Sequence, residues 1–159
     1  YAEYWLAYVN YALGESRAAV EHCELAVRAA TVLGDQRLAA QARATLGQAL
    51  AAAADYGGAL ALLDDTTRLR RDRETETRPS PGLAYALACK ASVLGDLGRF
   101  PEAMACFDDA LACLPWRGHE VEGSVLCWRS GVNLWQGRWE AARQDSAAAQ
   151  AIAERVRSL

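Results

Sequence analysis

Few side chains in this sequence could act as nucleophiles or as acid–base groups. The two histidines are His22 and His119, and His22 directly precedes Cys23 within an expected helix. Neighbouring residues of a helix point about 100° apart, so we do not expect a Cys–His nucleophile pair there. Both histidines are therefore expected to have structural roles.

The sequence also gives no support for a metal site or a phosphate-binding site. Cys106 and Cys113 lie seven residues apart on one expected helix, but two thiols without a nearby histidine make an incomplete metal site. The acidic pairs at 64–65 and 108–109 fall near helix ends, where solvated surface charge is expected. The sequence contains no glycine-rich phosphate loop. We therefore expect no enzyme, no metal and no cofactor, and catalysis would require titratable groups clustered in a cleft.

The composition favours an all-helical protein outside the membrane. Ala supplies 34 of the 159 residues, and Ala favours helix most strongly and is depleted from strands. Apolar runs such as Ala49–Ala54, with six residues, are far shorter than the roughly 20 that span a bilayer. The five cysteines form no CxxC pair, which predicts buried, reduced thiols and a cytoplasmic location.

The charge distribution argues against nucleic acid as a direct partner. The net charge is −3, and the run that begins at Arg68 is interleaved with acids, so that residues 68–78 sum to only +2. This run and the Pro-containing residues after it predict an exposed linker over about 72–81. Docking of a phosphate or an acidic partner is the alternative.

A fourfold internal repeat organises the chain. Each copy has an aromatic or small residue after a turn, an Ala three positions later, and an apolar or small residue four positions after the Ala. The first of these positions are 40, 44 and 39 residues apart. The three positions are occupied by Ser16, Tyr56, Phe100 and Trp139, then by Ala19, Ala59, Ala103 and Ala142, and then by Cys23, Leu63, Phe107 and Ser146.

Each copy predicts two helices joined by a short turn. The first helices are expected at about 2–13, 36–54, 82–97 and 120–136, and the second helices at about 16–33, 57–71, 101–114 and 139–157. The small Ala of each second helix would let two helices cross closely, and the residue one turn later would fill the space beside it. Gly34 is expected to stop a helix, Asp35 to cap the next one, and Pro101 to lie in a first turn.

The third copy resembles the tetratricopeptide repeat. The residues that match the turn and second helix of that family are Gly98, Phe100, Ala103, Phe107, Ala110, Leu111 and Pro115, and the second copy adds Leu46, Gly47 and Leu50. The copies are longer than the roughly 34 residues usual in that family. In this they are similar to the long repeats of MalT-like transcription activators, bacterial signalling ATPases and nucleotide cyclases.

The resemblance implies an all-α fold in which about four helical hairpins form a right-handed α–α superhelix, or solenoid. We expect a single domain over 1–159, with repeats of about 1–34, 35–78, 79–115 and 116–159, that is part of a longer protein. The function implied is a non-catalytic protein-interaction or regulatory module of a larger bacterial signalling or transcriptional regulator. The alternative is a domain that senses a small molecule or peptide and controls a fused cyclase, ATPase or DNA-binding domain.

Aromatic residues indicate where a partner would bind. Tyr1, Tyr4, Tyr8 and Tyr11 recur at steps of three and four residues and share one helix face. In the resembled family the first helices line a concave groove, which implies a binding set for a protein or peptide segment. The set is Tyr4, Tyr8, Tyr11, Gln41, Gln48, Tyr85, Ser92, Trp128 and Trp135. It lacks the Lys, Arg and Asn with which chaperone-binding members clamp a carboxylate, so we do not expect a co-chaperone of that kind.

The same aromatic residues have a second interpretation, because they would pack on a preceding repeat if the array extended beyond Tyr1. An end face that carries Tyr1, Tyr4 and Trp5 would also favour self-association into a homodimer. An enclosed pocket walled by Tyr8, Tyr85 and Trp128 would favour a small ligand, whereas an open trough would favour a protein segment.

Overall fold

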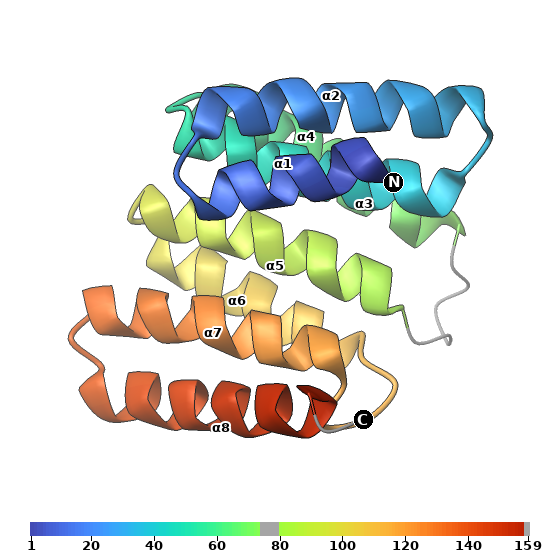
Figure 1. The fold of residues 1–159 in the computed structure, drawn as a ribbon. Coiled ribbons are helices and arrows are strands. Elements are labelled where there is room, and N and C mark those ends of the chain that lie inside the picture. The colour runs from blue at the N-terminus through green and yellow to red at the C-terminus, as the bar shows by residue number, and fades with distance from the viewer. Residues whose placement is uncertain (74–79, 158–159) are drawn as a thin grey trace. The chain divides into compact units, whose positions relative to one another are not determined.

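The computed structural model describes residues 1–73 and 80–157. These residues form eight α-helices and no β-strand, so the predicted all-α fold is confirmed (Figure 1). The helices are α1 (Ala2–Ala12), α2 (Ser16–Val32), α3 (Gln36–Ala52), α4 (Tyr56–Arg73), α5 (Pro81–Asp96), α6 (Phe100–Ala112), α7 (Glu120–Trp135) and α8 (Trp139–Arg157). Among these helices, none combines the length and the apolar character that a membrane span requires.

The chain divides into two compact units. Unit 1 is Tyr1–Asp72 and is built from α1–α4, and unit 2 is Arg73–Leu159 and is built from α5–α8. In unit 1, α2 packs on α1 and α3, and α1 also contacts α3. In unit 2, α5 packs on α6, α7 packs on α8, and α7 also packs on α5 and α6. Within each unit, helices that follow each other in the sequence therefore lie against each other, and the first helices of neighbouring copies are also in contact.

The helix ends agree with the predicted ranges to within two residues. The Asp35 carboxylate caps α3 by accepting a hydrogen bond from the Leu38 backbone N–H at 2.9 Å. Pro101 lies in the first turn of α6, where its missing N–H leaves no helical hydrogen bond unmade. The predicted linker over 72–81 falls mainly on residues 74–79, which lie outside the described residues, and α4 extends to Arg73.

One turn conformation recurs after five of the helices. A left-handed residue donates its N–H to the carbonyl three residues earlier, and the next residue donates to the carbonyl five residues earlier, as in the Schellman motif. At α5, for example, Gly98 N bonds to Gly95 O and Arg99 N bonds to Leu94 O, both at 2.9 Å. The left-handed residues are Gly14, Gly34, Gly98 and Gly137, with φ between +71° and +81°, and Ala54, with φ of +68°.

The exception at Ala54 gives a testable prediction. A left-handed conformation costs an L-residue about 1–2 kcal/mol, and glycine avoids this cost. Glycine also loses more conformational entropy on folding, which offsets about 0.5–1 kcal/mol of the gain in stability. We therefore expect Ala54→Gly to raise the free energy of unfolding by about 0.5–1 kcal/mol. The matched control is Gly98→Ala at the equivalent turn, which should lower it by about 1 kcal/mol. Urea denaturation measures both, and a loss of stability in Ala54→Gly would contradict the strain argument.

Small residues occupy the helix contacts that the repeat predicts. Ala19, Ala59 and Ala103 are fully buried, and Ala142 is nearly so. The residue one turn later is also fully buried in the first three copies, as Cys23, Leu63 and Phe107. In the fourth copy this residue is Ser146, which lies on an exposed face of α8. Both repeat positions are therefore buried in each of the first three copies. In the fourth copy the alanine is buried, but Ser146, one turn later, is exposed.

At Gly47, the contact between α3 and α4 is too tight for an added side-chain atom. A Cβ placed on Gly47 would come 2.5–2.8 Å from three atoms of the Leu63 side chain. We expect Gly47→Ala to lower the free energy of unfolding by about 1–3 kcal/mol, because added volume in a packed contact forces its neighbours to shift.

The matched control for Gly47→Ala is a helical glycine in open space. A Cβ on Gly131 of α7 would meet no atom within 4 Å. Gly131→Ala should therefore raise the free energy of unfolding by about 0.5–1 kcal/mol, the ordinary gain from replacing a mid-helix glycine. Changes of the same sign in the two variants, measured by urea denaturation, would refute a tight contact at Gly47.

Candidate interaction surface

The residues predicted to line the groove in unit 2 come from α5 and α7, which lie side by side. The rings of Tyr85 on α5 and Trp128 on α7 are in contact, with centroids 5.8 Å apart and planes inclined at 52°. Trp135 lies beside the last turn of α5, since a Cβ on Gly95 would come 3.6 Å from its ring. The structure thus brings Tyr85, Trp128 and Trp135 onto one face, which we name the α5–α7 surface. Ser92 shares it, because it is two helical turns from Tyr85.

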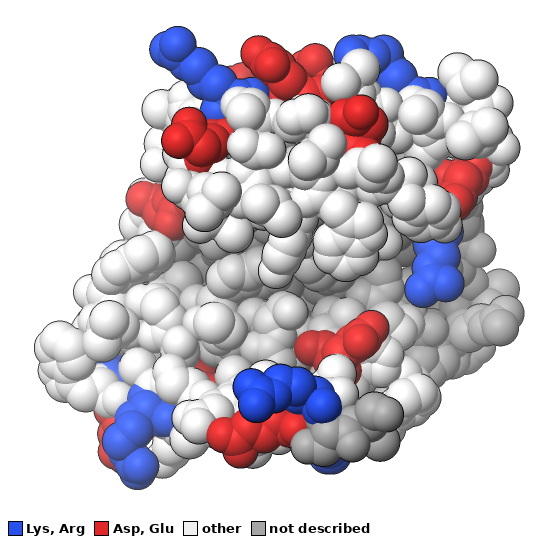
Figure 2. Space-filling view, in the orientation of Figure 1, with Lys and Arg blue, Asp and Glu red and all other residues white. Residues whose placement is uncertain are grey.

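The α5–α7 surface is open to solvent. Trp135 is 57% exposed, whereas Tyr85, Ser92 and Trp128 are half-buried. Gly131 lies between the two tryptophans on α7, and a Cβ built on it would have no atom of the described residues within 4 Å. In Figure 2, the face over α5 and the C-terminal half of α7 is almost wholly white, with charged residues gathered at its edges. Aromatic rings on such a face supply large rigid contact area together with a polar N–H or O–H.

The nearest charged residue of α7 is directed away from this surface. The Arg129 guanidinium donates to Asp145 of α8 from Nε at 2.9 Å and from Nη2 at 2.7 Å, and to Asp108 of α6 at 3.3 Å. Asn133 also donates to Asp145, at 3.0 Å. The hydrogen bonds from Arg129 to Asp145 raise the pKa of Arg129 above its ordinary value. Arg129 thus connects α7 to α6 and α8, and the aromatic rings remain on the α5–α7 surface.

In unit 1, the predicted groove residues divide between the core and the surface. Tyr4 is 5% exposed, and its hydroxyl accepts a hydrogen bond from Gln41 Nε2 at 3.0 Å, which joins α1 to α3. Gln48 is also buried, and its Nε2 has no hydrogen-bond partner within the described part of the chain. Tyr8 is exposed, and Tyr11 is half-buried. Tyr4 and Gln48 are therefore buried rather than solvent-facing, and Tyr4 is buried because α3 packs against α1.

The rest of α1 exposes apolar side chains. Tyr1 and Trp5 are exposed, and the Trp5 ring contacts the rings of Tyr4 and Tyr8 with centroids 5.4 and 6.2 Å apart. The homodimer expected through this end face stays a prediction. Tyr1 and Trp5 are exposed and available to contact a second copy, whereas Tyr4 is buried.

The two histidines make contacts that stabilise the helices. His22 Nδ1 lies 2.7 Å from Glu3 Oε2 and joins α2 to α1, and His119 Nδ1 accepts from the Val121 N–H at 3.1 Å and caps α7. Among the described residues, no group of three or more His, Cys, Asp or Glu side chains is placed to hold a metal ion.

The cysteines follow the expected burial with a clear exception. Cys23, Cys89 and Cys106 are buried, and burial raises the pKa of the Cys23 thiol to about 12 and that of Cys89 well above its ordinary value. Cys113 is half-buried. Cys127 is exposed, so the expectation of buried thiols was wrong for this residue, which lies on the outward side of α7.

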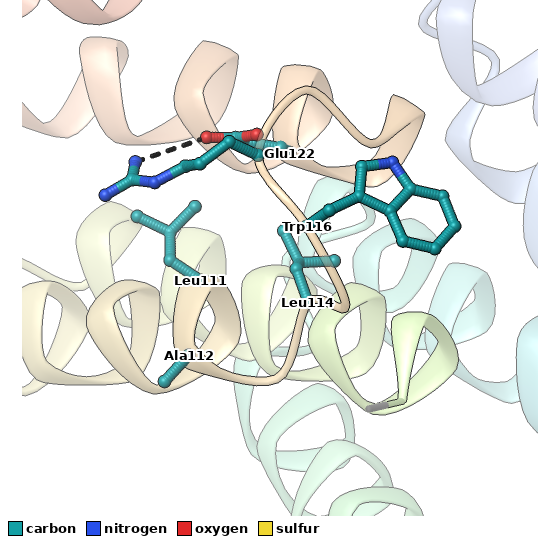
Figure 3. A pocket seen from close by; sticks show the side chains of 6 residues that line it. Leu111, Ala112, Leu114, Trp116 and Glu122 are labelled. Atoms are coloured by element: carbon teal, nitrogen blue, oxygen red, sulfur yellow. Dashed lines mark hydrogen bonds and ion pairs between the residues drawn. The ribbon is translucent and has the colours of Figure 1, made fainter. Parts of the chain in front are cut away.

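Sequence patterns did not reveal a pocket at the connection between α6 and α7 (Figure 3). Its volume is about 310 Å³, and its walls are Leu111, Ala112, Leu114, Trp116, Arg117 and Glu122. Acidic residues are common in the first turn of a helix, where they favour the helix dipole, so Glu122 resembled an ordinary solvated charge. The available signal was Trp116, an aromatic residue in a connection directly after a proline.

The sequence matches no protein-family model and no curated protein. The assignment of a role therefore depends on the geometry of the α5–α7 surface and of the pocket at the connection between α6 and α7.

Proposed function

We propose that the chain is a superhelix of about four hairpins, similar to tetratricopeptide repeats, that acts as a non-catalytic protein-interaction module. We place it within a larger bacterial signalling or transcriptional regulator, with a protein or peptide segment as its partner. The observation that carries the proposal is the α5–α7 surface, where Tyr85, Trp128 and Trp135 lie together and open to solvent.

The repeated local structure supports the superhelix. The same left-handed turn follows α1, α3, α5 and α7, and the Ala three residues into each second helix is buried. Within each unit, a first helix packs on the next first helix: α1 on α3, and α5 on α7. In a superhelix built from such hairpins, the first helices line one groove.

The form of the α5–α7 surface favours a protein segment over a small molecule. Tyr85 and Trp128 are in ring contact, so the space between these two rings is already filled. An extended or helical segment can lie across such a surface and use the rings as contact area, with the Trp indole N–H as a hydrogen-bond donor. Aromatic residues of this kind account for most of the binding energy in many interfaces.

Peptide selection tests this proposal. A random peptide library is displayed on phage and selected on the immobilised chain, and the dissociation constants of selected peptides are then measured by isothermal titration calorimetry. We expect Trp128→Ala or Trp135→Ala to weaken binding about 30-fold, the effect of losing a hot-spot side chain worth about 2 kcal/mol.

The control is Trp139→Ala, because Trp139 is also exposed but begins α8, outside the α5–α7 surface. This variant should change binding less than about twofold, the range of a residue outside the interface. Selected peptides that bind equally to all three variants, or a selection that yields no specific peptide, would contradict the proposed role of the α5–α7 surface.

A further inference from the structure

The pocket between α6 and α7 contains a buried acid. Glu122 is 5% exposed, so its carboxylate lies almost wholly inside unit 2. Its Oε2 accepts a hydrogen bond from the Gly118 backbone N–H, and its Oε1 lies 3.4 Å from Nη1 of Arg117. A carboxylate removed from water in this way gains from a cationic partner that binds it closely.

The connection that forms the pocket wall is fixed at both ends. The Cys113 carbonyl accepts a hydrogen bond from the Ser80 N–H at 2.9 Å, which ties the start of the connection to the N-cap of α5. At its other end, the Gly118 carbonyl accepts a hydrogen bond from Nη2 of Arg155 on α8. The pocket is therefore formed before any ligand binds, and little ordering would be needed on binding.

The other walls suit a long side chain with an apolar stem. Leu111 and Leu114 provide aliphatic contact, and Trp116 provides an exposed aromatic ring at the opening (Figure 3). The Trp116 ring is held against the His119 ring, with centroids 5.3 Å apart. A pocket lined by both an aromatic ring and a carboxylate favours a cation, which is attracted to both groups.

Arg117 shows which group the buried carboxylate accepts. Its guanidinium reaches Glu122 through a single atom pair at 3.4 Å, longer than the roughly 2.7–2.9 Å of a good charge-assisted hydrogen bond. The Arg117 side chain is 93% exposed, and ion pairs with so exposed a partner contribute little. A second guanidinium that entered the pocket at closer range would therefore displace it.

We propose that this pocket binds an arginine side chain from a partner protein. The guanidinium pairs with Glu122 in place of Arg117, its methylene groups lie against Leu111 and Leu114, and Trp116 covers the cation. The pocket opens to solvent at Ala112 and Trp116, so that a side chain can enter while its backbone stays outside. This site is distinct from the α5–α7 surface and does not depend on the function proposed for that surface.

The test uses N-acetylargininamide as the probe, titrated into the ¹⁵N-labelled chain and followed by NMR at the Trp116 indole N–H and the Gly118 amide. Trp116→Phe identifies the indole signal. The matched ligand is N-acetylcitrullinamide, which has the same shape but an uncharged urea group. We expect saturable shifts with the arginine probe and binding at least about tenfold weaker with the citrulline probe, because the charge-assisted bond is lost.

Three variants separate the roles of the walls. Arg117→Ala removes the internal competitor and should tighten binding about two- to fivefold. Trp116→Ala should weaken binding about two- to fivefold, and Glu122→Gln at least about tenfold. Arg117 and Trp116 are exposed, so their replacement leaves the fold intact even if Glu122→Gln does not fold.

Several results would overturn the proposal. Equal binding of the two probes, weaker binding to Arg117→Ala, or no saturable shift at either signal would show that the carboxylate does not recognise a guanidinium. Tighter binding of free L-arginine than of the capped probe would assign the pocket to the free amino acid and not to a protein side chain.

Discussion

Phe107→Ala is expected to lower the free energy of unfolding of unit 2 by about 3–5 kcal/mol, the usual cost of removing a buried aromatic side chain. Phe107 lies on α6 and is fully buried. It occupies the repeat position one turn after Ala103, where the first two copies place the fully buried Cys23 and Leu63. The loss combines the transfer of the ring to water with the cavity that α5 and α7 leave around it.

The matched control for this prediction is Phe100→Ala. Phe100 begins the same helix but is only half-buried, so its replacement should cost less than about 2 kcal/mol. Chemical denaturation followed by circular dichroism measures both variants. A cost for Phe107→Ala no greater than that for Phe100→Ala would contradict the importance of the buried ring at this repeat position.

The second large effect is expected at Asp145. Its side chain is 11% exposed and accepts hydrogen bonds from Arg129 at 2.7 and 2.9 Å and from Asn133 at 3.0 Å. Asp145→Ala would leave a largely buried guanidinium with only Asp108, at 3.3 Å, and an amide without its acceptor. We expect the free energy of unfolding to fall by about 2–4 kcal/mol, because unpaired buried charge is costly.

Unit 2 also provides an exposed pair of similar geometry as a control. Arg143 donates to Glu140 at 3.0 and 2.7 Å, but both side chains are mostly exposed. Glu140→Ala should therefore cost far less stability than Asp145→Ala. Similar losses of unfolding free energy for Asp145→Ala and Glu140→Ala in denaturant titrations would contradict this prediction. The burial of Asp145 would then not explain its contribution to stability.

The helices and turns could be predicted because local sequence specifies them. Alanine-rich segments favour helix, Gly98 and Gly137 adopt the left-handed turn without strain, and Asp35 caps the helix that follows it. Ala54 shows that the turn is also imposed by the helices it joins, since the residue there lacks the freedom of glycine and adopts the same conformation.

The candidate site could be predicted only in part, because exposure depends on packing between helices. Residue spacing predicted that Tyr85, Trp128 and Trp135 share one face, and in the structure Tyr85 contacts Trp128 while Trp135 lies beside the last turn of α5. The same spacing could not show that Tyr4 and Gln48 are buried. For Tyr4, contact with the neighbouring helix α3 decides the burial, and a helical period specifies only the face.

The buried acid of the pocket was beyond sequence prediction for a related reason. Glu122 is buried because the connection from Cys113 to Gly118 folds back over it and donates a backbone N–H. The conformation of such a connection depends on bonds to residues far away in the sequence, among them Arg155. No periodic pattern records contacts of this kind.

A crystal structure of the chain tests the central claim, a single repeat continued through four hairpins, most directly. We predict that α1, α2 and α3 of unit 1 superpose on α5, α6 and α7 of unit 2, as copies of a single repeat must. A structure in which these two sets of helices do not superpose would contradict the repeat and the superhelix proposed from it.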